Sequence, residues 1–221
     1  VTLPGIRYVI DSGLARLSRY NARTQVQRLQ IEPISQASAN QRQGRCGRLA
    51  PGICIRLYGE DDFRKRDPFT PPEIVRSSLS GVILTMLDLA LGDIESFPFI
   101  DPPSSAMIRD GYRQLDLLGA LENPPSQKPD AEARDSSPPT LSALGRRLAR
   151  LPLDPALARI LFAAHHKKVL ADALIVVAAM ECDDPRRRPI EKQAEADKLH
   201  ARFLTPLSDF AATLRLWRWY H

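Results

Sequence analysis

The sequence predicts a mixed fold, in which a short α/β segment is followed by a longer and mostly helical one. Short apolar runs over residues 6–10 and 53–58 have the length of strands, and a helix-like segment lies between them. After about residue 65 the chain instead shows stretches that start at proline and carry apolar residues at helical spacing. We therefore expect the end of a parallel α/β domain, with a helical region after it.

The first predicted strand, residues 6–10, is expected to be short and buried. Asp11 follows at its carboxyl end, which is the edge where open α/β sheets usually carry their ligand groups. A local role is the alternative, because an aspartate can also cap a turn formed by Ser12 and Gly13.

A β-hairpin is predicted next, over residues 15–34. Two extended polar segments, 15–20 and 26–32, surround a turn-prone Asn-Ala-Arg-Thr. The hairpin has few core residues, so we expect it to project from the domain and not to join its sheet. Its arginines suit sequence-independent binding of single strands, and a solvated surface hairpin is the alternative. These arginines are Arg16, Arg19, Arg23 and Arg28.

The octet Gln-Arg-Gln-Gly-Arg-Cys-Gly-Arg, residues 41–48, is the most informative stretch. If Ser38 caps a helix over residues 38–46, Gln41, Arg45 and Arg48 recur at i, i+4 and i+7 and share one face. One amide and two guanidinium groups aimed the same way suit a multiply charged oxyanion such as a triphosphate. Arg42 points elsewhere and is expected to pair with an acidic neighbour. The charge pattern alone also fits a solvated basic helix.

The rest of the chain is predicted to be helical. One helix starts at Asp154-Pro155, a cap followed by proline at the first helical position. Residues 169–182 are apolar almost all round, so we expect them to form the central helix of a bundle. Residues 123–139 are dense in Pro, Ser, Asp and Lys and are predicted to be a disordered insertion. The predicted helices cover residues 73–91, 104–118, 142–150, 156–167, 169–182, 190–203 and 207–220.

The composition is that of an ordinary globular protein, with 43% hydrophobic residues, 26% charged residues and a net charge of +5. The positive charge is compatible with a polyanionic partner. No apolar run is long enough to span a bilayer and no secretory leader is visible, so we expect no membrane association and a cytoplasmic location. The three cysteines and four histidines show no metal-ligand spacing, and we predict no metal site in this chain.

These motifs resemble those of the DEAH-box branch of superfamily 2 helicases. QRxGRxGR is the sixth conserved motif of that superfamily, and residues 41–48 match it at every fixed position. Val-Ile-Asp-Ser-Gly at residues 9–13 resembles the fifth motif, and residues 51–58 resemble the strand that follows the sixth. The Arg-Cys-Gly-Arg variant and the tail around Trp217 are most similar to bacterial HrpA-type RNA helicases. The resemblance covers nearly the whole chain, and it continues at residues 101–103, 118–121 and 151–155.

The resemblance implies three parts. Residues 1–66 are the C-terminal part of the second RecA-like domain, and residues 67–152 are a winged-helix domain that contains the insertion. Residues 153–221 start the helicase-associated ratchet bundle. The first RecA-like domain, with a GxxxxGK(S/T) phosphate loop and Asp-Glu-x-His, would lie N-terminal to Val1. We therefore expect the 221-residue chain alone to have no ATPase or unwinding activity.

The resemblance also implies ligands and roles. ATP or another NTP would bind with Mg²⁺, most of whose ligands lie outside this chain, and the intact enzyme would move 3′ to 5′ along single-stranded RNA, or DNA. Arg45 and Arg48 would act as arginine fingers on the γ-phosphate, and Gln41 would position water or a phosphate oxygen. Asp11 would help to couple nucleotide state to the nucleic-acid groove. Thr2 would contact an RNA phosphate, as would the hairpin arginines.

Two other classes of protein remain open. The first is a catalytically inert RNA-binding or adaptor protein, which would lack the phosphate loop and Asp-Glu-x-His upstream of Val1. The second is a winged-helix DNA-binding regulator, for which residues 67–150 would bind duplex DNA with sequence preference. Arg109 and Arg113 are the base-reading candidates of helix 104–118, and two such residues are few for a recognition helix.

Overall fold

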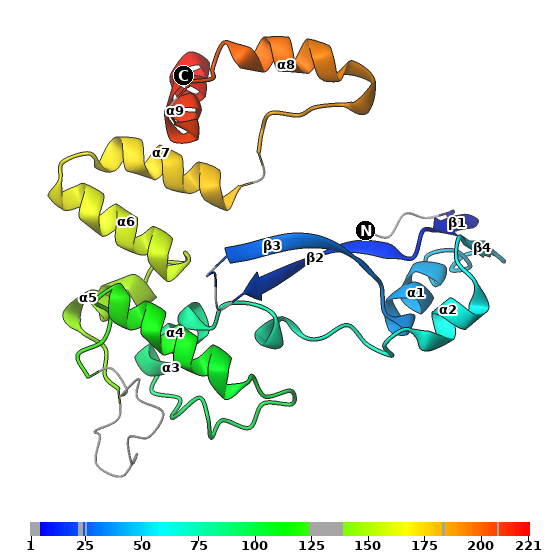
Figure 1. The fold of residues 1–221 in the computed structure, drawn as a ribbon, viewed down its shortest axis with the longest axis horizontal. Coiled ribbons are helices and arrows are strands. Elements are labelled where there is room, and N and C mark those ends of the chain that lie inside the picture. Colours follow the sequence, from blue (N-terminus) through cyan, green and yellow to red (C-terminus); the bar gives the residue numbers. More distant parts are fainter. Residues whose placement is uncertain (1–4, 22–23, 25, 124–138, 183, 207) are drawn as a thin grey trace. The chain divides into compact units, whose positions relative to one another are not determined.

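The fold is that of a computed structural model (Figure 1), which describes residues 5–21, 24, 26–123, 139–182, 184–206 and 208–221. It divides into two compact units. The first comprises Val1–Leu79 and Gly92–Gly111, and the second comprises Ser80–Leu91 and Tyr112–His221. The three parts expected from the sequence, 1–66, 67–152 and 153–221, have other boundaries, since 67–152 contains residues of both units, and they stay a prediction.

A parallel strand pair forms the sheet of the first unit. Strand β1 (Tyr8–Asp11) lies beside β4 (Ile53–Arg56), and Asp11 pairs with Arg56 at the end of the ladder. Helix α1 (Gln36–Gln43) lies between the two strands in sequence and packs against β1, as Figure 1 shows. The strands therefore present their carboxyl ends at one edge, with α1 next to it.

The burial predicted for the first strand is wrong for its outer face. Tyr8 and Ile10 are 70% and 71% exposed, and Ile53 and Ile55 beside them are also exposed. The cause is that α1 covers the opposite face, where Asp11 is buried. Parallel sheets are normally covered on both faces, whereas the outer face of this strand pair is apolar and exposed.

The predicted hairpin is confirmed. Strands β2 (Leu14–Asn21) and β3 (Val26–Pro33) pair antiparallel and form a sheet of their own, apart from β1 and β4. The far end of the hairpin is not free. The Tyr20 N–H donates to the Arg76 carbonyl oxygen at 2.8 Å, and Tyr20 Oη donates to Asp110 Oδ2 at 2.7 Å. The hairpin thus leaves the sheet as expected but is held at its distal end.

The helix predicted over residues 73–91 is shorter than expected. A 3₁₀ turn over Glu73–Val75 ends at Arg76, where φ is −134°, and α3 (Ser80–Asp88) begins after it. Arg76 is engaged by the hairpin, because its carbonyl accepts from Tyr20 and its Nη1 donates to the Ser18 carbonyl at 3.2 Å. These tertiary bonds interrupt a helix that the local pattern favours.

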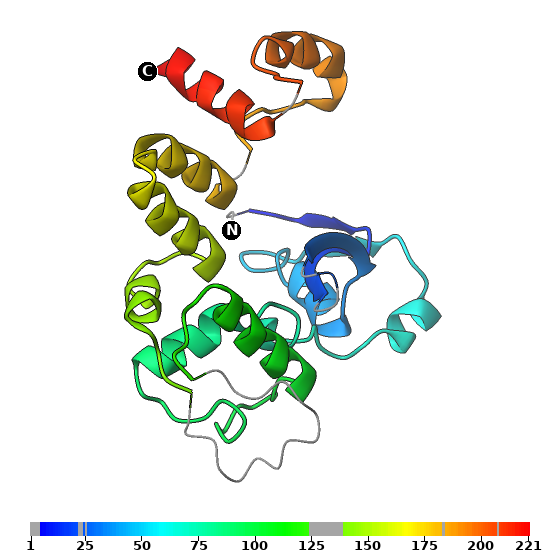
Figure 2. The same ribbon diagram turned by 60° about the vertical axis from the view of Figure 1, so that its left-hand side comes forward.

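The other predicted helices are present with small shifts at their ends. They are α4 (Ser105–Leu117), α5 (Ala143–Ala149), α6 (Pro155–His166), α7 (Leu170–Glu181), α8 (Gln193–Ala201, after a 3₁₀ turn over Ile190–Lys192) and α9 (Asp209–Tyr220). One further short helix is α2 (Glu60–Lys65). Asp154 caps α6 through the Ala156 N–H at 2.8 Å, with Pro155 at the first helical position, as expected. Helices α6 and α7 pack side by side in the second unit, as Figure 2 shows. Helix α4 crosses the division between the two units.

The apolar helix α7 is less buried than a central bundle helix. Among its residues only Val177 is fully buried, while Leu174 and Met180 are about half exposed. The reason is that α7 packs mainly against α6 and α9. The described residues leave part of α7 exposed, and its predicted place as the central helix of a bundle stays a prediction.

An isolated bridge joins Leu121 and Leu141 in the helical part. These two residues stand on either side of the predicted insertion 123–139, of which residues 124–138 lie outside the described residues. Within the described ranges, none of the helices combines the length and the apolar character that crossing a bilayer requires.

Candidate functional site

The octet spans the end of α1 and the turn after it. Ser35, and not Ser38, is the N-cap, because Ser35 Oγ accepts from the Ser38 N–H at 3.2 Å. The helix ends at Gln43, and Gly47 adopts a φ of +86° that turns the chain toward β4. Arg45 and Arg48 therefore lie beyond the helix, and the prediction that they share a helical face with Gln41 is wrong.

Arg42 pairs with an acidic residue, as predicted. Its Nη1 lies 2.6 Å from Asp11 Oδ1, and its Nη2 donates to the Leu14 carbonyl at 2.9 Å. The carboxylate of Asp11 is buried. Arg42 therefore joins α1 both to the end of β1 and to the start of the hairpin.

Asp11 accepts two further hydrogen bonds. The Gly13 N–H donates to Oδ1 and Tyr58 Oη donates to Oδ2, each at 2.9 Å. Burial by itself would raise the pKa of Asp11, but the bonds from Gly13, Arg42 and Tyr58 outweigh it and hold the pKa below its ordinary value. The local turn expected at Gly13 is therefore present, and the role of Asp11 in coupling to nucleotide stays a prediction.

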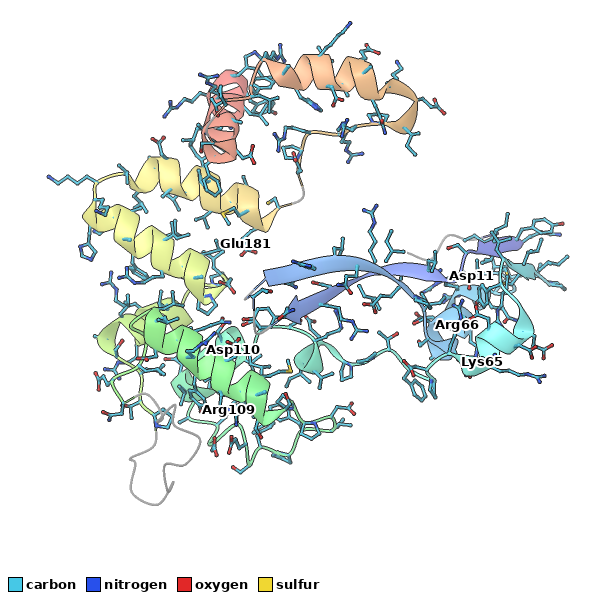
Figure 3. All side chains as sticks on the ribbon, viewed as in Figure 1. Asp11, Lys65, Arg66, Arg109, Asp110 and Glu181 are labelled. Carbon is cyan, nitrogen blue, oxygen red and sulfur yellow. The ribbon has the colours of Figure 1, made fainter. Side chains whose placement is uncertain are left out.

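Arg66 extends this group. Its Nη1 donates to the Gly13 carbonyl at 2.8 Å, its guanidinium lies 3.8 Å from the centre of the Tyr58 ring, and its Nη2 meets Asp62 Oδ2 at 2.7 Å. Figure 3 shows Asp11 and Arg66 in the same part of the first unit. We call Asp11, Arg42, Tyr58 and Arg66 the Asp11 cluster.

The other polar side chains of the octet differ in their partners. Gln43 Oε1 accepts from Arg56 Nη2 at 3.0 Å, and Arg48 Nε lies 3.5 Å from the Gly44 carbonyl. Gln41 and Arg45 have no side-chain hydrogen bond or ion pair within the part of the chain that the structure describes. Arg42 and Gln43 thus bind other residues of the chain, whereas Gln41 and Arg45 bind none of the described residues through their side chains.

The hairpin arginines do not form one surface. Cross-strand register pairs Arg16 with Ile31 and Arg19 with Arg28, so Arg16 lies on one face and the other two on the opposite face. Arg19 is bound by Glu32: its Nε donates to Oε1 at 3.0 Å and to Oε2 at 3.2 Å, and its Nη2 donates to Oε2 at 2.7 Å. Arg16 and Arg28 are exposed, and neither has a side-chain partner among the described residues. Arg23 and Thr2 lie outside the described residues.

Two members of the Asp11 cluster were missed from the sequence. Tyr58 follows β4 as Asp11 ends β1, and parallel strands bring those ends together, so this position was a usable signal. Arg66 carries no comparable signal, because it lies after the short helix α2 with no motif around it. In the described ranges, no three residues of the His, Cys, Asp or Glu type are placed to hold a metal ion.

Comparisons with known proteins agree on one group. Residues 154–213 match the helicase associated domain (HA2), ratchet-like. The chain is 52% identical over 219 residues to the ATP-dependent RNA helicase HrpA of Escherichia coli and 51% identical over 219 residues to the HrpA homolog of Haemophilus influenzae. Each alignment covers 99% of this chain and 16% of the relative. The chain thus spans a small part of the length of these relatives.

More distant similarity extends to eukaryotes and to a solved structure. The human ATP-dependent RNA helicase DHX33 is 33% identical over 218 residues, which are 99% of this chain and 29% of that protein. The crystal structure of the E. coli DExH-box NTPase HrpB matches with a TM-score of 0.66 and 31% identity, over 91% of this chain and 24% of that one. Structural similarity over most of the chain therefore accompanies the sequence match.

Proposed function

The chain belongs to the HrpA-type family of DEAH-box helicases, and from this we propose that it is part of an ATP-dependent RNA helicase. The observation that carries the proposal is the identity of 51–52% across 99% of the chain to proteins named as ATP-dependent RNA helicases. In that enzyme this segment contributes the arginine side of the ATP site and part of the RNA channel.

The nucleotide role falls on Gln41, Arg45 and Arg48. Arg45 is half-buried and has no protein partner in the described ranges, so its charge is available to a phosphate. A guanidinium next to the γ-phosphate stabilises the charge that develops during phosphoryl transfer, an effect of about 10³–10⁵ in rate. Gln41, exposed at the end of α1, would orient the attacking water or bind a phosphate oxygen. Arg48 would add a second positive charge.

The divalent ion belongs with the nucleotide. Mg²⁺ neutralises and bridges phosphate oxygens in such enzymes. The described residues include no group of three His, Cys, Asp or Glu side chains placed to hold a metal ion, and in this proposal most of the Mg²⁺ ligands lie outside this chain. Its own residues act on the nucleotide by charge and by orientation.

The RNA role falls on the hairpin. Exposed arginines on a protruding hairpin can follow the phosphates of a single strand without reading its sequence. Arg16 and Arg28 are exposed and unpaired within the described ranges, which supports this role for them more than for Arg19. Movement in the 3′ to 5′ direction is the family expectation that accompanies this role.

The domain assignment has separate support. The apolar outer face of β1 and β4 would be covered if residues 1–66 belonged to a larger RecA-like sheet, since parallel sheets are covered on both faces. The match of residues 154–213 to the ratchet-like domain supports the assignment of the last part. The winged helix over residues 67–152 rests on the resemblance of the sequence.

The proposal is tested on the gene and on the protein. The coding sequence upstream of Val1 should encode a GxxxxGK(S/T) phosphate loop and Asp-Glu-x-His, and the protein that includes them should hydrolyse ATP in an RNA-stimulated manner. The 221-residue chain alone should bind RNA and hydrolyse no ATP. An upstream sequence without these motifs would identify an inert RNA-binding or adaptor protein instead.

A further inference from the structure

Arg66 lies where α1, the Asp11 cluster and the base of the hairpin meet. Resting on the proposed function, we propose that Arg66 is the positioning residue that fixes the β2–β3 hairpin to the octet helix α1. A movement of α1 would then be passed to the hairpin. All of the residues involved belong to the first unit.

The base of the hairpin is held by two arginines. The Ile34 N–H closes the hairpin by donating to the Gly13 carbonyl at 2.9 Å. Arg66 Nη1 reaches the same carbonyl at 2.8 Å and the Ile34 carbonyl at 3.4 Å, and Arg42 Nη2 reaches the Leu14 carbonyl at 2.9 Å. Arginine side chains therefore bind the hairpin at its base, next to the start of β2 and the end of β3.

The backbone around Arg66 is tied to the start of α1. The Arg66 carbonyl accepts from Gln36 Nε2 at 2.8 Å. The next two carbonyls, of Asp67 and Pro68, accept from the N–H groups of Gln36 and Ala37 at 2.9 and 3.0 Å. These bonds satisfy the first donors of the helix, which have no partner inside it. The segment that carries Arg66 therefore moves with α1.

The Arg66 side chain has little freedom to adapt. It is 7% exposed, it stacks on Tyr58, and Asp62 holds its Nη2. Its Nε is buried and has no partner among the described residues. An unpaired buried donor is unfavourable, so the guanidinium is held by its other contacts in a position that leaves Nε without a hydrogen bond among the described residues.

Gly13 makes the close approach possible. It adopts a φ of +73°, and an added Cβ would lie 2.6 Å from two Tyr58 ring atoms and 2.7 Å from Arg66 Nη2. Tyr58 in turn donates to Asp11, which binds Arg42. The octet helix therefore reaches the hairpin base twice, through Arg42 near its end and through Arg66 at its start.

The first test uses the 221-residue chain and needs no enzymatic activity. In Arg66→Ala, the Ile34 amide should exchange its hydrogen at least about tenfold faster, because the Gly13 carbonyl that accepts from it is no longer held by Arg66. The Tyr20 amide at the distal end should be unchanged. Arg64→Ala is the matched control, since Arg64 lies on α2 in an exposed ion pair with Glu60. An Ile34 amide that exchanges at the wild-type rate in Arg66→Ala overturns the proposal.

A conservative variant guards against general unfolding. Arg66→Lys keeps a positive charge beside Asp62 but lacks the planar fork that bonds carbonyls while stacking on Tyr58. It should keep the β1–β4 amides protected and still release the Ile34 amide. If Arg66→Lys protects Ile34 as well as arginine does, charge alone suffices and the positioning role is wrong.

The second test uses the longer protein of the proposed function, which includes the sequence upstream of Val1. Arg66→Ala should retain RNA-stimulated ATP hydrolysis close to wild type and lose at least about tenfold in duplex unwinding, because hydrolysis no longer moves the hairpin. A parallel loss of both activities would contradict the proposal. If the unmutated protein hydrolyses no ATP, the proposed function is wrong. The exchange rate of the Ile34 amide still tests whether Arg66 holds the base of the hairpin.

Discussion

The guanidinium of Arg42 lies 2.6 Å from the carboxylate of Asp11, whose side chain is fully buried. The two residues come from the octet helix and from the end of the first strand. Their pairing removes Arg42 from the residues that can meet a ligand, and it leaves Gln41 and Arg45 as octet side chains without a partner in the described ranges. The pair therefore gives Arg42 a structural role and leaves Gln41 and Arg45 for the proposed nucleotide role.

The stability of the first unit should depend on this pair. Arg42→Ala should lower the free energy of opening at the β1 and β4 amides by about 2 kcal/mol. This is less than the roughly 3–5 kcal/mol typical of breaking a fully buried pair. The reason is that Arg42 is one-third exposed and that Gly13 and Tyr58 still bind Asp11. Native-state hydrogen exchange measures the change. Arg64→Ala, which removes an exposed pair, should have almost no effect, and an equal loss in both variants would refute a special role for Arg42.

Acid should weaken the fold through Asp11. The pKa of Asp11 lies below its ordinary value of 3.8, so the ionised form stabilises the folded state fully above that pH. The contribution is lost as pH falls through the folded pKa. Asp11→Asn should be less stable than wild type at neutral pH, and the difference should shrink on acidification. Thermal unfolding between about pH 2 and pH 6 tests this, and a difference independent of pH would be inconsistent with it.

Gly13 should tolerate no side chain. Gly13→Ala combines strain at φ +73° with overlap of Tyr58 and Arg66. Gly92 has a φ of +90° and nothing within 4 Å of an added Cβ, so Gly92→Ala is the matched control that measures the cost of backbone strain alone. We expect about 1 kcal/mol for Gly92→Ala and at least about 2 kcal/mol more for Gly13→Ala. Equal costs in urea unfolding of the two variants would show that the contact at Gly13 is unimportant.

RNA binding should distinguish the hairpin arginines. Arg16→Ala and Arg28→Ala should each weaken binding to single-stranded RNA and lower the salt dependence of the affinity by about one counterion. Arg19→Ala should change the salt dependence less, because Glu32 already neutralises Arg19. Titration of a labelled oligonucleotide at several salt concentrations makes the comparison. The same loss at all three positions would mean that the Arg19–Glu32 pair opens on RNA.

The sequence predicted those features that depend on local pattern. The hairpin followed from two extended polar segments around a turn, and its strands lie within one or two residues of the expected limits. The cap at Asp154 and the helix after it followed from Asp-Pro. Pairing of Arg42 followed from its position on a different face from Gln41. In each case neighbouring residues determine the structure.

The errors arise where distant segments intervene. Ser35 caps α1 although Ser38 was expected, and its hydroxyl also lies 3.0 Å from that of Thr70. The helix expected at residue 73 is interrupted at Arg76 because the hairpin binds its carbonyl. The early end of α1 is instead local: Gly44 is its C-cap, so Arg45 and Arg48 lie in the turns before β4. Arg66 could not be found, since its partners are carbonyls of residues far away in sequence.

The central claim is that the octet acts on the nucleotide. ATP hydrolysis by the longer protein that includes the sequence upstream of Val1, carrying Arg45→Ala, tests this claim most directly. If Arg45 contacts the γ-phosphate in the transition state, kcat for RNA-stimulated ATP hydrolysis should fall by about 10³–10⁵ while RNA affinity stays unchanged. Arg45→Lys should recover little of the rate, because an ammonium does not reproduce the guanidinium fork. Wild-type hydrolysis by Arg45→Ala would contradict the assignment of the octet to the nucleotide.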